Sequence, residues 1–204
     1  MFTSVLATVL AASSVVSAAA VRRGATTVSV TPHDSYSSSV GVLGCKINTN
    51  QVVYWPWPVD CDNICVKVTN EDRSLYLLHV DQSGGAFDMS YEAWVGGGVN
   101  MQYENVPASY CSGLLDDGKL PLSASNSMNY LASCLAQPSS WVAGNYQLFN
   151  VLDSQCHWGY NETCTLDLSV SNQPTCKHQL GVPVATVGLN VTNIQYATGL
   201  EVSA

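Results

Sequence analysis

Apolar and polar residues alternate along three stretches between Cys61 and Cys111, and this period of two predicts β-strands. The alternation covers residues 65–69, 75–81 and 99–104. A half-buried strand shows this pattern because successive side chains point to opposite faces. The polar link 70–73 between the first two stretches is short enough for a hairpin. This part of the chain is therefore expected to form a β-sheet whose strands are half buried.

A brief helix is expected between the second and third of these strands. Ser90 is placed to cap it, Glu92 lies in its first turn, and Tyr91 and Trp94 lie along it. The glycine run 96–98 is expected to end this helix and to lead into the strand that follows.

The flanking segments have weaker patterns. Residues 24–42 are rich in Ser and Thr and are expected to form an extended arm, and 45–53 is expected to be a strand. Apolar residues at helical spacing in 121–135 predict a helix capped by Ser123. A second helix is expected over 141–152, capped by Ser139 or Ser140, although Gly144 weakens this prediction. A strand is expected within 182–191, and the last dozen residues are expected to be disordered.

Several motifs fall in a characteristic order. Cys61 and Cys65 precede the first strand, Val80-Asp81 ends the second, 87–90 reads Phe-Asp-Met-Ser, and 103–111 runs from Tyr to Cys. This order resembles the six-stranded double-psi β-barrel of the barwin, kiwellin, expansin and barwin-fold endoglucanase families. Those families have two residues between the paired cysteines, whereas this chain has three. Within that group the chain is most similar to small secreted fungal proteins, some of them effectors.

The resemblance implies a mainly β protein: a double-psi β-barrel with a disulfide-linked C-terminal extension that carries one or two helices. The expected organisation is a signal peptide in 1–20, an N-terminal arm in 21–43, the barrel in 44–111, a helical disulfide-rich extension packed on the barrel in 112–181, and a C-terminal strand and tail in 182–204.

The first twenty residues are apolar and end in small residues, as in a secretory signal peptide, so we expect a secreted, extracellular protein. Arg22-Arg23 is either a second processing point or a solvated pair. The chain carries seven Lys and Arg against fifteen Asp and Glu, a net charge of −8. Without these two arginines, the only charged residues before Gly24, the net charge is −10. Such an acidic protein is a poor partner for nucleic acid or an anionic membrane.

The even number of cysteines in a secreted chain predicts four disulfides. A metal site near 156–157 and 176–178 is the weaker alternative, because no Cys-x-x-Cys pair is present. The resemblance implies the pairs Cys45–Cys61 and Cys65–Cys111, with the remaining four cysteines paired among themselves. These four are Cys134, Cys156, Cys164 and Cys176.

Two carboxylates are candidates for catalysis. The resemblance places Asp88 where the endoglucanase relatives have the acid that protonates the leaving oxygen, and Asp81 at a second acidic position of expansin-like domains. The motif that supplies the base in those enzymes has no carboxylate here, since the nearest aromatic motif reads Tyr54-Trp55-Pro56. Asp88 also has a structural interpretation, as a residue that binds free N–H groups at a helix start, and we favour it.

Other candidate binding residues are aromatic or titratable. His79 either forms a pair with Asp81 that titrates near neutral pH, or is a histidine on the strand surface. The rigid segment 54–58, Tyr-Trp-Pro-Trp-Pro, offers a platform for a sugar ring or a partner side chain, or else its tryptophans cap the core. The expected binding residues are Tyr54, Trp55, Trp57, His79, Asp81, Asp88 and Tyr103.

Asn161 and Asn190 each begin an N-glycosylation sequon and are therefore expected on the surface. No motif for a cofactor, a nucleotide or a metal stands out. We expect a monomeric secreted binding protein, acting as a fungal effector on a host apoplastic protein such as a papain-like cysteine protease, or on wall polysaccharide. An expansin-like or endoglucanase-like enzyme is the alternative, and a structural wall or spore-coat protein is a third possibility.

Overall fold

The computed structural model describes residues 24–91, 93, 98–195 and 197–204. The predicted signal peptide and the pair Arg22-Arg23 lie outside these residues. So do Glu92, Trp94 and two glycines of the predicted helix that follows Ser90.

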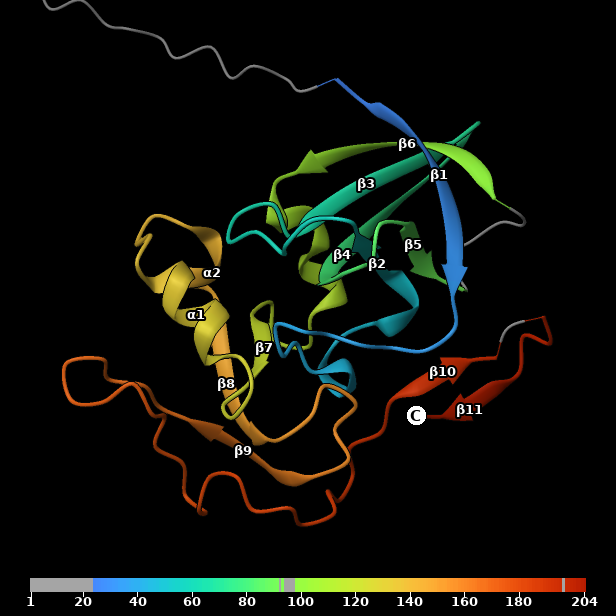
Figure 1. The fold of residues 1–204 in the computed structure, drawn as a ribbon. Coiled ribbons are helices and arrows are strands. Elements are labelled where there is room, and N and C mark those ends of the chain that lie inside the picture. Colours follow the sequence, from blue (N-terminus) through green and yellow to red (C-terminus); the bar gives the residue numbers. More distant parts are fainter. Residues whose placement is uncertain (1–23, 92, 94–97, 196) are drawn as a thin grey trace, which may run out of the picture.

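Six strands form a closed barrel (Figure 1). Around the barrel their order is β1-β5-β2-β4-β3-β6; β1 pairs with β5 and β2 with β4 in parallel, and the remaining neighbours are antiparallel. The bounds are β1 Thr26–His33, β2 Val52–Trp55, β3 Cys65–Asn70, β4 Arg73–Gln82, β5 Phe87–Ser90 and β6 Val99–Val106. The prediction of a mainly β protein with a six-stranded barrel is confirmed.

The alternation in the sequence corresponds to the two faces of the barrel wall. All six strands contribute to one buried cluster, which therefore fills the interior. Leu78 and Val80 instead belong to a second core outside the barrel, shared with the C-terminal part of the chain. Strands β3 and β4 are joined at Glu71-Asp72, where Glu71 has a φ of 49°. The predicted hairpin is thus a tight two-residue turn, which needs positive φ.

The barrel begins earlier in the chain than the sequence suggests. β1 lies within the stretch predicted to be an arm, and it closes the barrel by pairing with β5 and β6. Only Val30 of β1 is buried, and its Ser and Thr residues lie mainly on the outer face. A strand whose exposed face is polar resembles a polar linker in composition, which is why the sequence suggested an arm. The prediction of an arm over 21–43 is wrong because residues 26–33 form β1.

Two other local predictions need correction. The segment predicted as a strand from Cys45 forms the 3₁₀ helices η1 Gly44–Lys46 and η2 Thr49–Gln51, and β2 begins only at Val52. The Phe-Asp-Met-Ser motif is strand β5 and not a helix start. The Ser90 hydroxyl donates to the carbonyl of Asn50, and the N–H of Val52 donates to that hydroxyl, so it ties β5 to β2.

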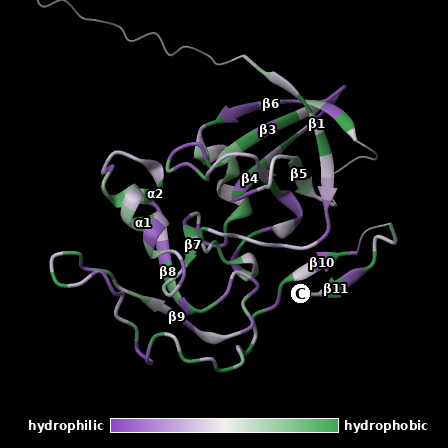
Figure 2. Ribbon diagram, in the orientation of Figure 1, coloured by the Kyte–Doolittle hydropathy of each residue, from purple (hydrophilic) through white to green (hydrophobic). Residues whose placement is uncertain are grey.

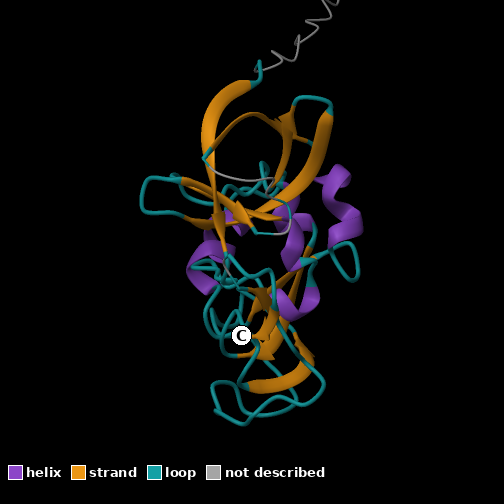
Figure 3. Cartoon of the chain, turned by 90° about the vertical axis from the view of Figure 1, so that its right-hand side faces the viewer, coloured by secondary structure: helices purple, strands orange, loops and turns teal. Residues whose placement is uncertain are grey.

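The C-terminal extension is built around a three-stranded sheet, of order β7-β8-β9, and is less helical than predicted. Its strands are β7 Leu120–Ser123, β8 Tyr146–Val151 and β9 Gly159–Cys164, and its helices are η3 Ala108–Leu114, α1 Met128–Leu135 and α2 Trp141–Gly144. Figure 3 shows the strands in two groups, with most helices at the level between them.

The two helix predictions in this extension are partly right. The first helix exists from Met128, but residues 120–123 form β7, and the Ser123 hydroxyl donates to the carbonyl of Val151 instead of capping a helix. The second helix stops at Gly144, although Ser140 does cap it. Residues 148–151 are all buried, because β8 is the central strand of its sheet. A short, mostly apolar run of this kind fits a buried strand or a helix equally well.

The end of the chain forms a hairpin of β10 Thr192–Ile194 and β11 Glu201–Ser203. The strand expected within 182–191 and the disorder expected in the last dozen residues are therefore both wrong. The hairpin is held to the rest of the molecule, because the Tyr36 N–H donates to the Asn193 side chain and the His157 ring nitrogen Nε2 bonds to the Ala204 carbonyl oxygen at 3.0 Å.

Four disulfides join the cysteines as Cys45–Cys156, Cys61–Cys134, Cys65–Cys111 and Cys164–Cys176. The pair Cys65–Cys111 is confirmed, and Cys45–Cys61 is wrong, because each of its members bonds to the extension. Two disulfides and one continuous apolar core thus join the barrel to the extension. Figure 2 shows hydrophobic residues in green both on barrel strands and on β7 of the extension. Four disulfides indicate an oxidising, extracellular environment. Within the described residues, no helix has the length and apolar character needed to cross a membrane.

Candidate functional site

A hollow of about 360 Å³ lies at the surface of the barrel beside the segment that follows β2. We call it the aromatic groove. Its volume falls within the range of small-molecule sites, roughly 300–1,000 Å³. Aromatic rings and short polar side chains share its lining, which consists of Trp57, Pro58, Asp60, Asn63, Tyr103 and Asn105.

The ring of Trp57 belongs to a cluster of four aromatic side chains. It lies 5.8 Å from Tyr103 and 5.4 Å from Phe87 between ring centroids, and Trp55 lies 5.2 Å from Phe87. Trp55 is fully buried in the barrel interior, whereas Trp57 is only half-buried. The core interpretation of the aromatic segment therefore holds for Trp55, whereas Trp57 lines the groove.

The polar rim of the groove is held in place by its own hydrogen bonds. One carboxylate oxygen of Asp60 accepts from the N–H groups of Asp62 and Asn63, at 2.7 and 2.8 Å, and from the Asn63 side chain. The hydroxyl of Tyr130, on α1, donates to the Asp60 carbonyl. Such a rim is preorganised, which lowers the entropy lost when a ligand binds.

The extension holds this segment through further bonds. Cys61 forms its disulfide to Cys134 of α1, and the N–H of Val142 donates to the Cys61 carbonyl. The N–H of Trp141 donates to the Asp62 carboxylate at 2.7 Å. The barrel alone therefore does not build the groove, because α1 and α2 fix one of its walls.

His79 is buried beside Trp57 and does not lie on the strand surface. Its side chain is buried, with 2 % exposed, and its ring centroid is 6.5 Å from that of Trp57. Burial lowers the pKa of His79 to about 4. Hydrogen bonding with the Asp81 backbone and the negative charges of Asp81 and Asp60 oppose this by raising the pKa. The imidazole is thus neutral at physiological pH, so neither interpretation of His79 made from the sequence describes it.

The two predicted acids lie on either side of Tyr54. The strand register places Tyr54 of β2 opposite Asp81 of β4 and opposite Asp88 of β5. Tyr54 is buried, and its pKa is raised, first by desolvation and then by the charges of both carboxylates. Across the adjacent strands β4, β2 and β5, the two carboxylates are therefore separated by the Tyr54 side chain.

Each carboxylate also has a bonding partner within the protein. Asp81 is 8 % exposed and accepts from the Ser37 hydroxyl at 2.7 Å and from the Gln82 N–H at 2.8 Å. Asp88 accepts from the hydroxyl of Thr31 on β1. A helix cap for Asp88 is excluded by its place in β5, and its carboxylate instead links β5 to β1.

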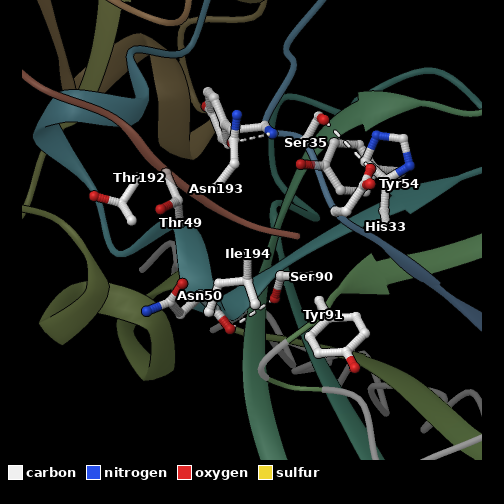
Figure 4. A pocket seen from close by; sticks show the side chains of 12 residues that line it. His33, Ser35, Thr49, Asn50, Tyr54, Ser90, Tyr91, Thr192, Asn193 and Ile194 are labelled. Carbon is white, nitrogen blue, oxygen red and sulfur yellow. Dashed lines mark hydrogen bonds between the residues drawn. The ribbon is translucent and has the colours of Figure 1, made fainter. Parts of the chain in front are cut away.

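A second, polar hollow lies between the barrel and the C-terminal hairpin (Figure 4). The His33 and Tyr54 rings meet at one end, 4.4 Å apart, and Asn193 and Ile194 of β10 form another wall. Its volume of about 10 Å³ is close to that of one water molecule and is too small for a sugar ring.

Sequence reasoning found Trp57 and Tyr103 but missed Asp60, Asn63 and Asn105. Asp60 and Asn63 follow the aromatic segment and precede Cys65 within a turn-rich stretch, which was a usable signal. No signal in the sequence pointed to Asn105, because it lies on a strand 42 positions after Asn63 and only the fold brings the two together. No group of three metal-ligating side chains occurs among the described residues.

Comparison with protein-family models, with curated proteins and with solved structures finds no match for this chain.

Proposed function

We propose that this protein is a secreted, non-catalytic glycan-binding protein, and that its ligand lies in the aromatic groove. One observation carries the proposal: the half-buried Trp57 and Tyr103 share a groove with the side chains of Asp60, Asn63 and Asn105. The C–H face of a sugar ring packs on an aromatic face. Amide and carboxylate groups exchange hydrogen bonds with sugar hydroxyls. A wall polysaccharide offers both C–H faces and hydroxyl groups, and it repeats them along its chain.

The wider setting is part of the same proposal. The parallel pairs β1–β5 and β2–β4 within a closed six-stranded barrel support a double-psi arrangement and the likeness to barwin, kiwellin and expansin domains. The disulfides and the apolar start of the chain support secretion as a monomer, as for a small fungal apoplastic protein. A host secreted protein is the alternative ligand.

Removing the Trp57 ring is expected to lower the affinity for a glycan tenfold or more, because the largest apolar contact of the groove disappears; tenfold corresponds to about 1.4 kcal/mol. The measurement is calorimetric titration of Trp57→Ala with cellohexaose, laminarihexaose and xylohexaose. Trp158→Ala is the matched control, because Trp158 is 46 % exposed and belongs to the extension. Equal affinities of Trp57→Ala and the wild type, or no binding of any of the three to the wild type, would reject the groove as a glycan site.

One observation favours the enzyme alternative. Asp81 and Asp88 are two strands apart, a backbone separation of roughly 9–10 Å. Inverting glycosidases place their carboxyl groups ~6.5–9.5 Å apart so that a water fits between them. Here the Tyr54 side chain, 4 % exposed, lies between the two acids in the same row. It leaves no room for a sugar and a water, so we favour binding.

Asp88→Asn is expected to leave both folding and glycan affinity unchanged, since the amide oxygen still accepts from Thr31. Asp88→Ala removes that acceptor and is expected to cost about 0.5–1.5 kcal/mol of unfolding free energy. Thermal unfolding and calorimetric titration measure the two effects. Release of reducing sugars from glucan or xyloglucan by the wild type, abolished in Asp88→Asn, would establish the enzyme instead.

A further inference from the structure

Two buried polar atoms on side chains next to Trp57 have no hydrogen-bond partner in the described part of the chain. They are Nε2 of His79 and Nε1 of Trp55. Buried polar groups are almost always paired, so each unpaired one requires an explanation. An unpaired group at a ligand site is often one that a ligand satisfies.

The chemistry of the two atoms is complementary. Nε2 of the neutral His79 ring has no hydrogen-bond partner. With the ring proton on Nδ1, Nε2 is an acceptor. The indole Nε1 of Trp55 is a donor only.

Trp57 lies next to both unpartnered groups. Its ring centroid is 6.4 Å from that of Trp55 and 6.5 Å from that of His79. Trp57 also lines the groove, so both unpartnered groups lie beside a ring of the groove's own lining. Pro56 and Pro58 restrict the backbone on either side of it. Access therefore depends on the side-chain torsions of Trp57.

We propose that the floor of the aromatic groove contains a hydroxyl-binding subsite, reached by rotation of Trp57, in which one ligand hydroxyl donates to His79 Nε2 and accepts from Trp55 Nε1. A hydroxyl fits because it is donor and acceptor at once, whereas a carbonyl matches only the indole and an ammonium only the imidazole. The subsite rests on the proposed function and adds to it a specificity-determining pair of residues.

The test replaces His79 by phenylalanine, which keeps a planar ring and removes the acceptor. Affinity for the hexasaccharide that binds the wild type is expected to fall about tenfold. Without ligand, the melting temperature is expected to rise by about 2–4 °C, because an unpaired buried nitrogen is removed. His33→Phe is the matched control: His33 also packs on an aromatic side chain, Tyr54, but lies outside the groove. It should leave the affinity unchanged.

Two results would overturn the subsite. Unchanged affinity in His79→Phe, with affinity lost in Trp57→Ala, would leave the groove as a glycan site and reject the subsite. A lower melting temperature of His79→Phe would mean that the nitrogen is already bonded, for example to a permanently bound water. A merely structural role of His79 would not produce higher stability together with weaker binding.

A second measurement does not need a glycan. Ethylene glycol serves as a minimal hydroxyl probe, and nitrogen NMR follows His79 Nε2 and Trp55 Nε1. Both resonances are expected to move toward hydrogen-bonded values in the wild type, and further still when a bound hexasaccharide replaces the probe. If no hexasaccharide binds, the proposed function is wrong, and the ethylene glycol titration alone decides the subsite: a shift of both resonances supports it, and no shift rejects it.

Discussion

Replacing Cys61 and Cys134 together by alanine is expected to lower the free energy of unfolding by about 2–5 kcal/mol and to weaken glycan binding. The disulfide closes 73 positions of sequence, and closing a long loop restricts the unfolded chain strongly. It also anchors the segment that carries Asp60 and Asn63 to α1. Losing it should therefore loosen one wall of the groove. Urea unfolding and calorimetric titration measure the two effects.

The double replacement of Cys164 and Cys176 is the matched control. This disulfide spans only 12 positions and lies in the extension away from the groove. Its loss is expected to cost less stability, about 3 kcal/mol or below from loop closure, and to leave the affinity unchanged. An equal loss of affinity in both double variants would mean that the groove depends on general stability and not on the Cys61–Cys134 bond.

Acidification from pH 6.5 to pH 4 is expected to destabilise the protein by about 3 kcal/mol through His79 alone. The pKa of His79 is about 4 in the folded protein and about 6.5 in an unfolded chain. Between these values the unfolded state binds a proton that the folded state does not, so the free energy of unfolding falls as the pH falls. Each pKa unit is worth 1.36 kcal/mol. Below pH 4 both states are protonated at this residue, and its contribution stops changing.

The comparison of the wild type with His79→Phe isolates this effect from all other titrating groups. Their difference in unfolding free energy, from urea titrations at several pH values, should be constant above pH 7 and should grow by about 3 kcal/mol on going to pH 4. Asp60 and Asp81 are the charged groups that act on His79, and both remain in the variant. Parallel curves across this range would show that His79 is solvated in the folded protein.

Strand content between Cys61 and Cys111 followed from the sequence because successive side chains of a strand point to opposite sides of the barrel wall. The prediction of half-buried strands is wrong for β4, which is buried on both faces at 77–81, because the core shared with the extension covers its outer face. The alternation in β3, β4 and β6 is visible in the sequence of each strand by itself. These strands can therefore be recognised without knowing which strands they pair with. The β3–β4 turn and the helix cap at Ser140 were local signals as well. Four disulfides followed from an even cysteine count in a chain with an apolar start, and Trp57 and Tyr103 were recognised by residue type.

Other features depended on partners far apart in the sequence. Whether β1 is an arm or a strand depends on β5 and β6, and whether 148–151 is helix or strand depends on β7 and β9. The partners of Cys45 and Cys61 lie 111 and 73 positions away, on elements that only packing brings near.

The candidate site divides in the same way. The sequence by itself determined that aromatic residues and prolines gather at 54–58 and that Asp81 lies at the end of a strand. It placed Asp88 at a helix start, whereas tertiary structure puts Asp88 in β5. Tertiary structure decided that Trp55 points into the barrel and Trp57 into a groove, because that choice depends on the rings of Phe87 and Tyr103 across the barrel. It also buried His79, whose neutral imidazole follows from desolvation by the surrounding fold and not from its neighbours in the chain.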